Sequence, residues 1–228
     1  MPRKTRMHLP GIPVHVVQRG NNRDACFFVE DDYRYFLDRL REGRGRFGVA
    51  LHAYVLMTNH VHLLMTPRDT ADISRLMQHL GRHYVLYINR QYRRTGTLWE
   101  GRHKASLVQA DKYLLTCMRY IELNPVMAGM VESPEQYRWS SYRSHAWGQT
   151  DELLSEHELY ERLGGTVAER HHAYRQLLRS QLSEIDIHDI RACLVYNYPP
   201  GNDRFREQVE TMLASVSDSA SMGARPSM

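Results

Sequence analysis

The spacing of apolar residues predicts a mixed chain in which short strands alternate with long amphipathic helices. Residues 31–46 and 73–92 repeat apolar side chains every three or four positions, as does a helix that buries one face. Strand-length apolar runs occupy four further segments, 12–19, 51–57, 61–65 and 106–109. The resulting order, β-α-β-β-α-β, predicts an α+β fold, a ferredoxin-like sandwich with a largely antiparallel sheet.

A further helix is predicted over residues 111–124, where Asp111 is expected to cap the first turn and Pro125 to end the helix. The spacing i, i+3, i+4, i+7 gives this helix an apolar stripe made of Leu114, Cys117, Met118 and Ile121. Tyr120 and Asn124 lie one turn apart on an adjoining line. A phenol and a carboxamide are therefore expected to share one face of the helix.

The chain beyond residue 147 is expected to form a helical extension. Amphipathic patterns predict helices at 153–163, 168–182, 183–196 and 203–213. We therefore divide the chain into a domain at 1–147, an extension at 148–214 and a tail at 215–228. The tail is rich in Ser, Gly and Ala and is expected to be disordered.

Charge separates the same two parts of the chain. Residues 1–147 hold 22 Lys and Arg against 13 Asp and Glu, a net charge of +9, whereas residues 148–228 hold 8 against 13, a net charge of −5. Most of the cations are arginine, which can grip phosphate with two hydrogen bonds and stack on bases. This balance favours a nucleic-acid partner for the first part, although any single arginine can equally be an ordinary solvated side chain.

Cysteine usage and the start of the chain bear on its compartment. Three widely spaced cysteines match neither a disulfide framework nor a zinc site, so a reduced, cytoplasmic setting is expected. The first six residues are basic, but no long apolar stretch follows them, so we expect neither a signal peptide nor a membrane span.

Two histidines form the first candidate site. His60 and His62 lie two apart in a predicted strand, so both imidazoles should project from one face. Neutral imidazole is a common metal ligand, and a third ligand would have to come from another element. Asn124 and Tyr120 would converge on the site if their line faces the sheet. The residues alone also allow Tyr120 to point to solvent and Asn124 to cap the helix end.

Four segments together show a resemblance to a known family. They are Val-His-Val-Val-Gln-Arg-Gly-Asn-Asn-Arg at 14–23, Tyr-Val-Leu-Met-Thr-Asn-His-Val-His at 54–62, Leu-Trp-Glu-Gly-Arg-His-Lys at 98–104 and Tyr-Ile-Glu-Leu-Asn-Pro-Val at 120–126. Over about residues 7–147 the chain resembles the one-tyrosine HUH transposases, and within them the REP-associated tyrosine transposases. The resemblance implies a compact α+β domain that cuts single-stranded DNA with a tyrosine and a divalent metal.

Site roles follow from this resemblance position by position. His60 and His62 match the paired metal ligands, Tyr120 the nucleophile and Asn124 the helix residue that completes the metal site. Related transposases carry glutamine at the last position, where this chain departs from them. Imidazole, carboxamide and water would suit Mg²⁺ or Mn²⁺. Tyr113 is the rival nucleophile, because it lies seven residues earlier on nearly the same helix face.

Candidate DNA-binding residues come from two loops and the basic start of the chain. They are Arg19, Asn21, Asn22 and Arg23 after the first strand, Trp99, Arg102 and Lys104 before the last strand, and Arg3, Lys4 and Arg6. Aromatic rings beside cations suit unstacked bases, although a core role for Trp99 and an ordinary turn at 20–23 are the alternatives. The expected partner is single-stranded or hairpin DNA, bound by a monomer or homodimer near the nucleoid.

The preferred function is that of a metal-dependent single-stranded DNA endonuclease and strand-transferase. It would form a 5′-phosphotyrosine intermediate and act on hairpin repeats of the REP type, a substrate implied by the resemblance. Two alternatives stay open: a REP-hairpin-binding protein with little or no cleavage, and a metal phosphoesterase in which water attacks.

Overall fold

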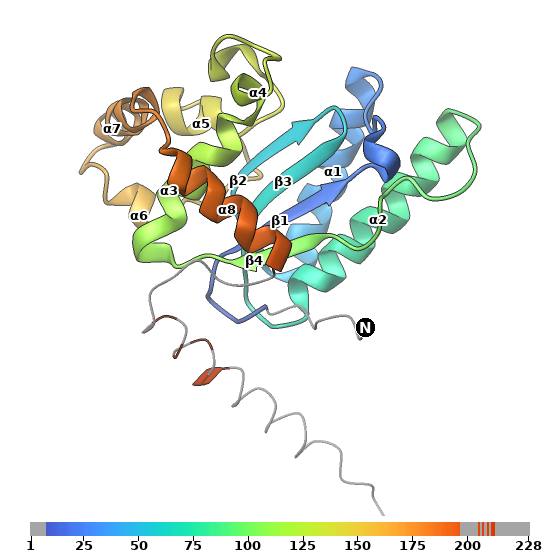
Figure 1. Ribbon diagram of the computed structural model, residues 1–228, viewed down its shortest axis with the longest axis horizontal. Helices are drawn as coiled ribbons and strands as arrows, with labels where there is room; N and C mark the ends of the chain where they lie inside the picture. Colours follow the sequence, from blue (N-terminus) through green and yellow to red (C-terminus); the bar gives the residue numbers. More distant parts are fainter. Residues whose placement is uncertain (1–7, 197–204, 206, 208, 210, 213–228) are drawn as a thin grey trace, which may run out of the picture.

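The computed structural model describes residues 8–196 and, beyond them, residues 205, 207, 209, 211 and 212 (Figure 1). The first half contains β1 Val14–Arg19, α1 Glu30–Phe47, β2 Val49–Met57, β3 His60–Pro67, α2 Asp72–Gln91, β4 Lys104–Leu107 and α3 Ala110–Glu122. This order confirms the predicted β-α-β-β-α-β arrangement followed by a helix. The last predicted strand begins two residues earlier than expected.

The sheet has four antiparallel strands in the order β2-β3-β1-β4. The α+β fold with an antiparallel sheet is therefore confirmed. β3 is an inner strand, and His62 lies between Val17 of β1 and Val55 of β2. Hydrogen bonding on both sides fixes the backbone that carries the two histidines.

The two faces of the sheet are covered by different helices. α1 and α2 lie on one face, whereas α3 and the later α8 lie on the other (Figure 1). Along β3 the side chains alternate, so that Val61 and Leu63 join the apolar cluster beneath α1 and α2 while Leu64 joins the cluster beneath α3. His62 alternates with Val61 and Leu63 and therefore faces α3.

Both ends of α3 differ from the sequence prediction. Gln109 occupies the N-cap position and Asp111 lies inside the first turn, so Asp111 is not the cap. Because only two residues separate β4 from α3, the helix starts one residue earlier than predicted. The Asp111 carboxylate can still stabilise the positive N-terminal end of the helix. α3 ends at Glu122, and a separate short helix, α4 Asn124–Met127, holds Pro125 in its first turn, where a missing N–H costs nothing.

Short helices and an extension follow α4. They are η2 Pro134–Gln136, α5 Tyr142–Trp147, α6 Glu158–Glu161, α7 Val167–Arg179 and α8 Glu184–Tyr196. The last two confirm the helices predicted at 168–182 and 183–196. The helix predicted at 153–163 is wrong apart from α6, because the preceding segment docks against the sheet edge: Leu153 is buried, and the Ser155 amide donates to the Leu51 carbonyl at 2.8 Å.

Other predictions fall where little or nothing is described. The helix predicted at 203–213 is described only at five of its positions, all helical, and Phe205 and Val209 are buried in the apolar cluster beneath α1 and α2. The tail at 215–228 and the basic residues Arg3, Lys4 and Arg6 lie outside the described residues. Within the described part of the chain, no helix has both the length and the apolar character needed to cross a membrane.

Candidate active site

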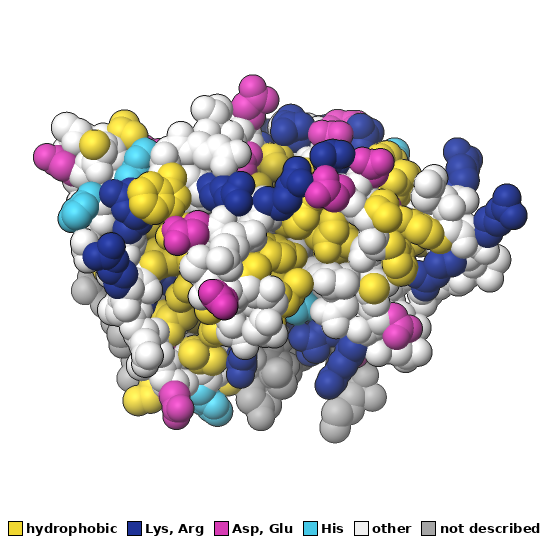
Figure 2. Space-filling model, turned by 90° about the horizontal axis from the view of Figure 1, so that it is seen from above, with side chains coloured by type: hydrophobic (Ala, Val, Ile, Leu, Met, Phe, Trp, Pro, Cys, Tyr) yellow, Lys and Arg dark blue, Asp and Glu magenta, His cyan; other side chains and the backbone are white. Residues whose placement is uncertain are grey.

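A single cleft collects most of the residues predicted to carry chemistry. The cleft has a volume of about 600 Å³ and is lined by His60, His62, Tyr120, Asn124, Arg19, Arg102 and Lys104, among others. These residues come from β1, β3, the loop into β4, α3 and α4. Seen from above, Lys and Arg side chains are spread over this face of the molecule with Asp and Glu between them (Figure 2). The cations of the cleft are identified by its lining residues, which include Arg19, Arg102 and Lys104.

The ring of His60 is fixed by its neighbour in the chain. Asn59 donates from Nδ2 to the Arg23 carbonyl at 2.9 Å, which turns its Oδ1 toward His60 Nδ1 at 2.7 Å. An amide oxygen only accepts, so Nδ1 carries the proton and Nε2 carries the lone pair. Burial, with a smaller effect of Arg19, lowers the pKa of His60 to about 4. His60 is therefore neutral at pH 7, as a metal ligand must be.

His62 is fixed by a third histidine. His62 Nδ1 lies 2.8 Å from Nε2 of His15, which is buried in β1. If His62 offers Nε2 to a cation, its Nδ1 carries the proton and donates to His15. Burial, with smaller effects of His15 and His60, lowers the pKa of His62 well below its usual value. Burial also lowers the pKa of His15 to about 3, so all three imidazoles are neutral at pH 7.

Tyr120 and Asn124 face the two histidines. The Tyr120 side chain is buried, and its ring centroid lies 5.8 Å from that of His62 in an edge-to-face arrangement. Asn124 lines the same cleft as His60, and its Nδ2 lies 3.5 Å from the Tyr120 carbonyl oxygen, although Asn124 belongs to α4 rather than α3. Tyr113 instead lines a small separate cavity with His15 and Cys117. The geometry therefore favours Tyr120 over Tyr113.

The donor set fits a hard or borderline divalent cation. Two imidazole side chains and a carboxamide side chain line the same cleft, and solvent can complete a ligand shell there. Within the part of the chain that the structure describes, no three His, Cys, Asp or Glu side chains come together as a metal site. A cation here would therefore depend on Asn124 and water, which suits Mg²⁺ or Mn²⁺ better than a structural zinc ion.

The predicted DNA-binding residues divide into two groups. Arg19, Arg102 and Lys104 line the cleft, where Gln18 holds the loop in place by donating to the Gly101 carbonyl at 3.0 Å. The other predicted residues that the structure describes are outside the cleft lining. Asn21, Asn22 and Arg23 form the 3-10 turn η1 Asn21–Arg23, and Trp99 packs partly buried against the apolar cluster beneath α1 and α2.

The turn η1 is held in an unusual backbone conformation. Asn22 has a φ of 52° and Arg23 a φ of 62°. Residues other than glycine seldom adopt this left-handed region of backbone conformation. The bond from Asn59 to the Arg23 carbonyl helps to hold it. The same asparagine therefore orients His60 and fixes the loop that leaves β1.

Sequence reasoning missed three residues in or next to the site, and one buried residue of the helix that carries Tyr120. His15 interrupts an apolar strand, and its polarity was a usable signal; Asn59 directly precedes the first histidine of the pair. Glu122 is fully buried, which its sequence position does not indicate. Arg191 lines the cleft from α8, and nothing in the sequence connects that helix to the site.

Comparison with known proteins provides independent findings. A family model described as "Transposase IS200 like" matches residues 9–124, about half of the chain. A solved structure described as a REP-associated tyrosine transposase bound to a REP hairpin is similar, with a TM-score of 0.56 and 17% sequence identity, over 69% of this chain and 93% of the other. This likeness shows the fold.

A second solved structure, a Deinococcus radiodurans R1 protein described as a candidate transposase, has 20% sequence identity and a TM-score of 0.36, over 51% of this chain and 94% of the other. That TM-score is too low to support an argument. No curated protein matches the chain.

Proposed function

Because the chain belongs to the IS200-like transposase family, we propose that it cuts and rejoins single-stranded DNA with Tyr120 as the nucleophile. One observation carries the proposal: the Tyr120 phenol, two neutral imidazoles and the Asn124 carboxamide converge in a cleft whose wall also carries cations. We take residues 1–147 as the unit that carries this chemistry.

The proposed reaction is a transesterification, in which one phosphodiester bond replaces another. The Tyr120 oxygen forms a bond to phosphorus while the bond from phosphorus to the 3′ oxygen breaks. The phenol loses one proton and the departing 3′ oxygen gains one, so the products are a 5′-phosphotyrosine and a free 3′ hydroxyl. The bond energy is retained in the covalent intermediate. Attack by another 3′ hydroxyl then joins two DNA ends without ATP.

The side chains of the cleft divide the remaining tasks. His60, His62 and Asn124 would hold a divalent cation, which as a Lewis acid would offset negative charge on the nonbridging phosphate oxygens. Arg19, Arg102 and Lys104 would neutralise nearby phosphates and so add affinity without reading sequence. Burial keeps Tyr120 in a fixed position against the sheet.

Hairpin DNA is the proposed substrate. The protein of similar fold described above was solved bound to a REP hairpin, and single-stranded DNA next to a hairpin presents both a duplex to grip and an unpaired strand to cut. REP-type repeats are therefore the first substrates to test. A hairpin of unrelated sequence and a linear strand of the same composition are the controls.

The test is covalent capture. Wild-type protein incubated with end-labelled hairpin DNA and Mn²⁺ should give a protein–DNA adduct that survives denaturing electrophoresis, and Tyr120→Phe should give none. Tyr113→Phe is the matched control, because it removes a hydroxyl from the same helix outside the cleft, and it should keep the adduct.

Other outcomes would favour the alternative functions. Cleavage that persists in Tyr120→Phe would mean that water attacks, as in a phosphoesterase. Hairpin binding by the wild type without any adduct would favour a binding protein. An adduct lost in Tyr113→Phe and kept in Tyr120→Phe would exchange the roles of the two tyrosines.

A further inference from the structure

The C-terminal extension places a cation beside the proposed nucleophile. Arg191 and Leu194 of α8 line the same cleft as Tyr120, and Arg191 Nε lies 3.5 Å from the Tyr120 hydroxyl oxygen. Arg191 is also close enough to His62 to lower the pKa of that imidazole. It lies well beyond residues 9–124, the segment that the transposase family model matches.

The helix that carries Arg191 is anchored by its other face. Ile187 and Ile190 pack into the apolar cluster beneath α3, and Ile190 and Cys193 border the small cavity that also contacts Cys117. Arg191 and Leu194 lie three residues apart on the adjoining stripe of α8. The packing of α8 therefore turns Arg191 toward the cleft.

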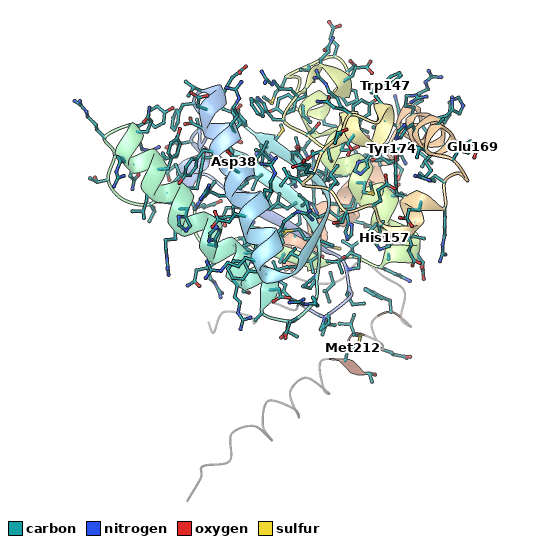
Figure 3. All side chains as sticks on the ribbon, turned by 180° about the vertical axis from the view of Figure 1, so that it is seen from behind. Asp38, Trp147, His157, Glu169, Tyr174 and Met212 are labelled. Carbon is teal, nitrogen blue, oxygen red and sulfur yellow. The ribbon has the colours of Figure 1, made fainter. Side chains whose placement is uncertain are left out.

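The rest of the extension is bonded to the helix that carries Tyr120. Tyr174 of α7 donates to Glu122 Oε2 at 2.7 Å, and Tyr174 lies inside the molecule while Glu169 of the same helix lies at its edge (Figure 3). Arg119 donates to the carbonyl and hydroxyl oxygens of Ser180, between α7 and α8. With the Arg191 contact, three positions of α3 from Arg119 to Glu122 meet the extension, so the extension is fixed relative to the nucleophile.

The position of Arg191 matches a need of the reaction. The other cations of the cleft lie on the sheet side of Tyr120: Arg19 on β1, Arg102 in the loop before β4 and Lys104 at the start of β4. A phosphate attacked by Tyr120 would also expose oxygens on the helix side. A guanidinium has five donors in a planar fork, so one can reach the phenol while others bind an anionic oxygen.

We propose that Arg191 is a catalytic residue supplied by the extension, which binds a nonbridging oxygen of the scissile phosphate beside the Tyr120 hydroxyl. The inference rests on the proposed function, because it assumes that Tyr120 attacks DNA. It assigns the extension an active part in cleavage. The opposite role, in which α8 covers the cleft and obstructs DNA, predicts a rate change of opposite sign.

The experiment compares Arg191→Gln and Arg191→Lys with wild type in single-turnover adduct formation on hairpin DNA. Loss of one donor to a developing charge typically slows a reaction about 100-fold or more, so we expect a loss of about 100-fold for Arg191→Gln. Arg191→Lys keeps the charge without the fork and should be intermediate. Hairpin affinity and melting temperature should change little, because one exposed arginine among several cations is altered.

Arg179→Gln is the matched control, since Arg179 is an exposed arginine of the same extension outside the cleft lining, and it should leave the rate unchanged. An unchanged or faster rate in Arg191→Gln would overturn the inference, and so would a slower rate with parallel losses of affinity and melting temperature. If the wild type itself gives no adduct, the proposed function fails first, which is a distinguishable result.

Discussion

The two faces of the sheet each bury an apolar cluster, but they differ in the polar groups that join it. Beneath α1 and α2 the side chains are mainly apolar or aromatic; the ring centroids of Tyr84 and Phe36, for example, lie 5.1 Å apart. The Tyr84 hydroxyl donates a hydrogen bond to the Cys26 carbonyl at 2.7 Å. Beneath α3 and α8 the sheet carries His15 and His62, and α3 brings a buried carboxylate, Glu122.

The buried carboxylate and the two buried imidazoles of this face are hydrogen-bonded. Glu122 accepts from Ser141 at 2.6 Å, His145 at 2.7 Å and Tyr174 at 2.7 Å, and His15 pairs with His62. Each bond offsets the cost of removing those groups from water. The comparison teaches that the larger apolar cluster lies on one face, whereas the other face combines apolar packing with polar groups held in fixed positions.

His62→Ala should produce the largest functional effect, because it removes a proposed cation ligand from the polar face. We expect Mn²⁺-dependent adduct formation to fall by more than about 100-fold, since metal chemistry needs its ligands in place. The melting temperature of the wild-type protein should rise when Mn²⁺ is added, and that of His62→Ala should rise much less. An equal Mn²⁺ shift in both proteins would remove His62 from the metal site.

Glu122→Ala should produce the largest loss of stability. The change leaves three buried donors without their acceptor, and breaking a buried charged network costs about 3–5 kcal/mol. Urea unfolding should show this loss, and Glu122→Gln, which keeps an acceptor oxygen, should lose less. A loss below about 1 kcal/mol for Glu122→Ala would mean that the polar face does not depend on this carboxylate.

Leu63→Ala is the matched change on the apolar face, one residue along β3 from His62. Leu63 is fully buried, and truncating a buried leucine costs about 2–5 kcal/mol. Adduct formation per folded molecule should stay near the wild-type level at low temperature. A folded Leu63→Ala protein with no activity would break the division of labour between the two faces.

His15→Phe should produce a moderate effect, because it removes the hydrogen-bond partner of His62 while filling similar space. Loss of a partner that orients a metal ligand costs about 10- to 100-fold in metal affinity. Mn²⁺ titration of the purified protein measures this effect directly. His15→Gln, which retains an acceptor, should recover part of the affinity, whereas equal losses in both variants would mean that the imidazole only fills space.

The smallest effect concerns pH and a buried histidine of β2. His52 bonds the Ser155 carbonyl and the Thr66 hydroxyl, each at 2.8 Å, and burial lowers its pKa to about 4. The unfolded chain takes up this proton near pH 6.5, so the contribution of His52 to stability is complete above that pH and falls as the pH drops toward 4. The slope is at most about 1.4 kcal/mol per pH unit.

Urea unfolding in EDTA at pH 7 and pH 5 measures this effect. Wild-type protein should lose more stability between the two values than His52→Gln does, because the glutamine cannot take up a proton. Parallel losses in the two proteins would mean that His52 is protonated in the folded state.

Local sequence patterns predicted much of the fold and the paired histidines of the site. The succession of strands and helices along the chain, and the alternation that puts His60 and His62 on one face, depend on neighbouring residues. The helix ends were less accurate: Asp111 was misplaced as a cap, and the helix at 153–163 gave way to loop segments docked on β2. The short connection from β4 set the start of α3, whereas contacts with β2 outweighed local propensity in the segment before α6.

The sequence by itself determined which groups exist at which spacing, namely the paired imidazoles and a phenol four residues before a carboxamide. Tertiary structure alone decided how they meet. His15 and His62 are 47 positions apart, Glu122 and Tyr174 are 52 apart, and Tyr120 and Arg191 are 71 apart. Local periodicity reports only on residues within a few turns, whereas these contacts depend on how the whole chain packs. His62 therefore takes its orientation from His15 of β1, whereas Arg191 reaches Tyr120 through the packing of the extension on α3.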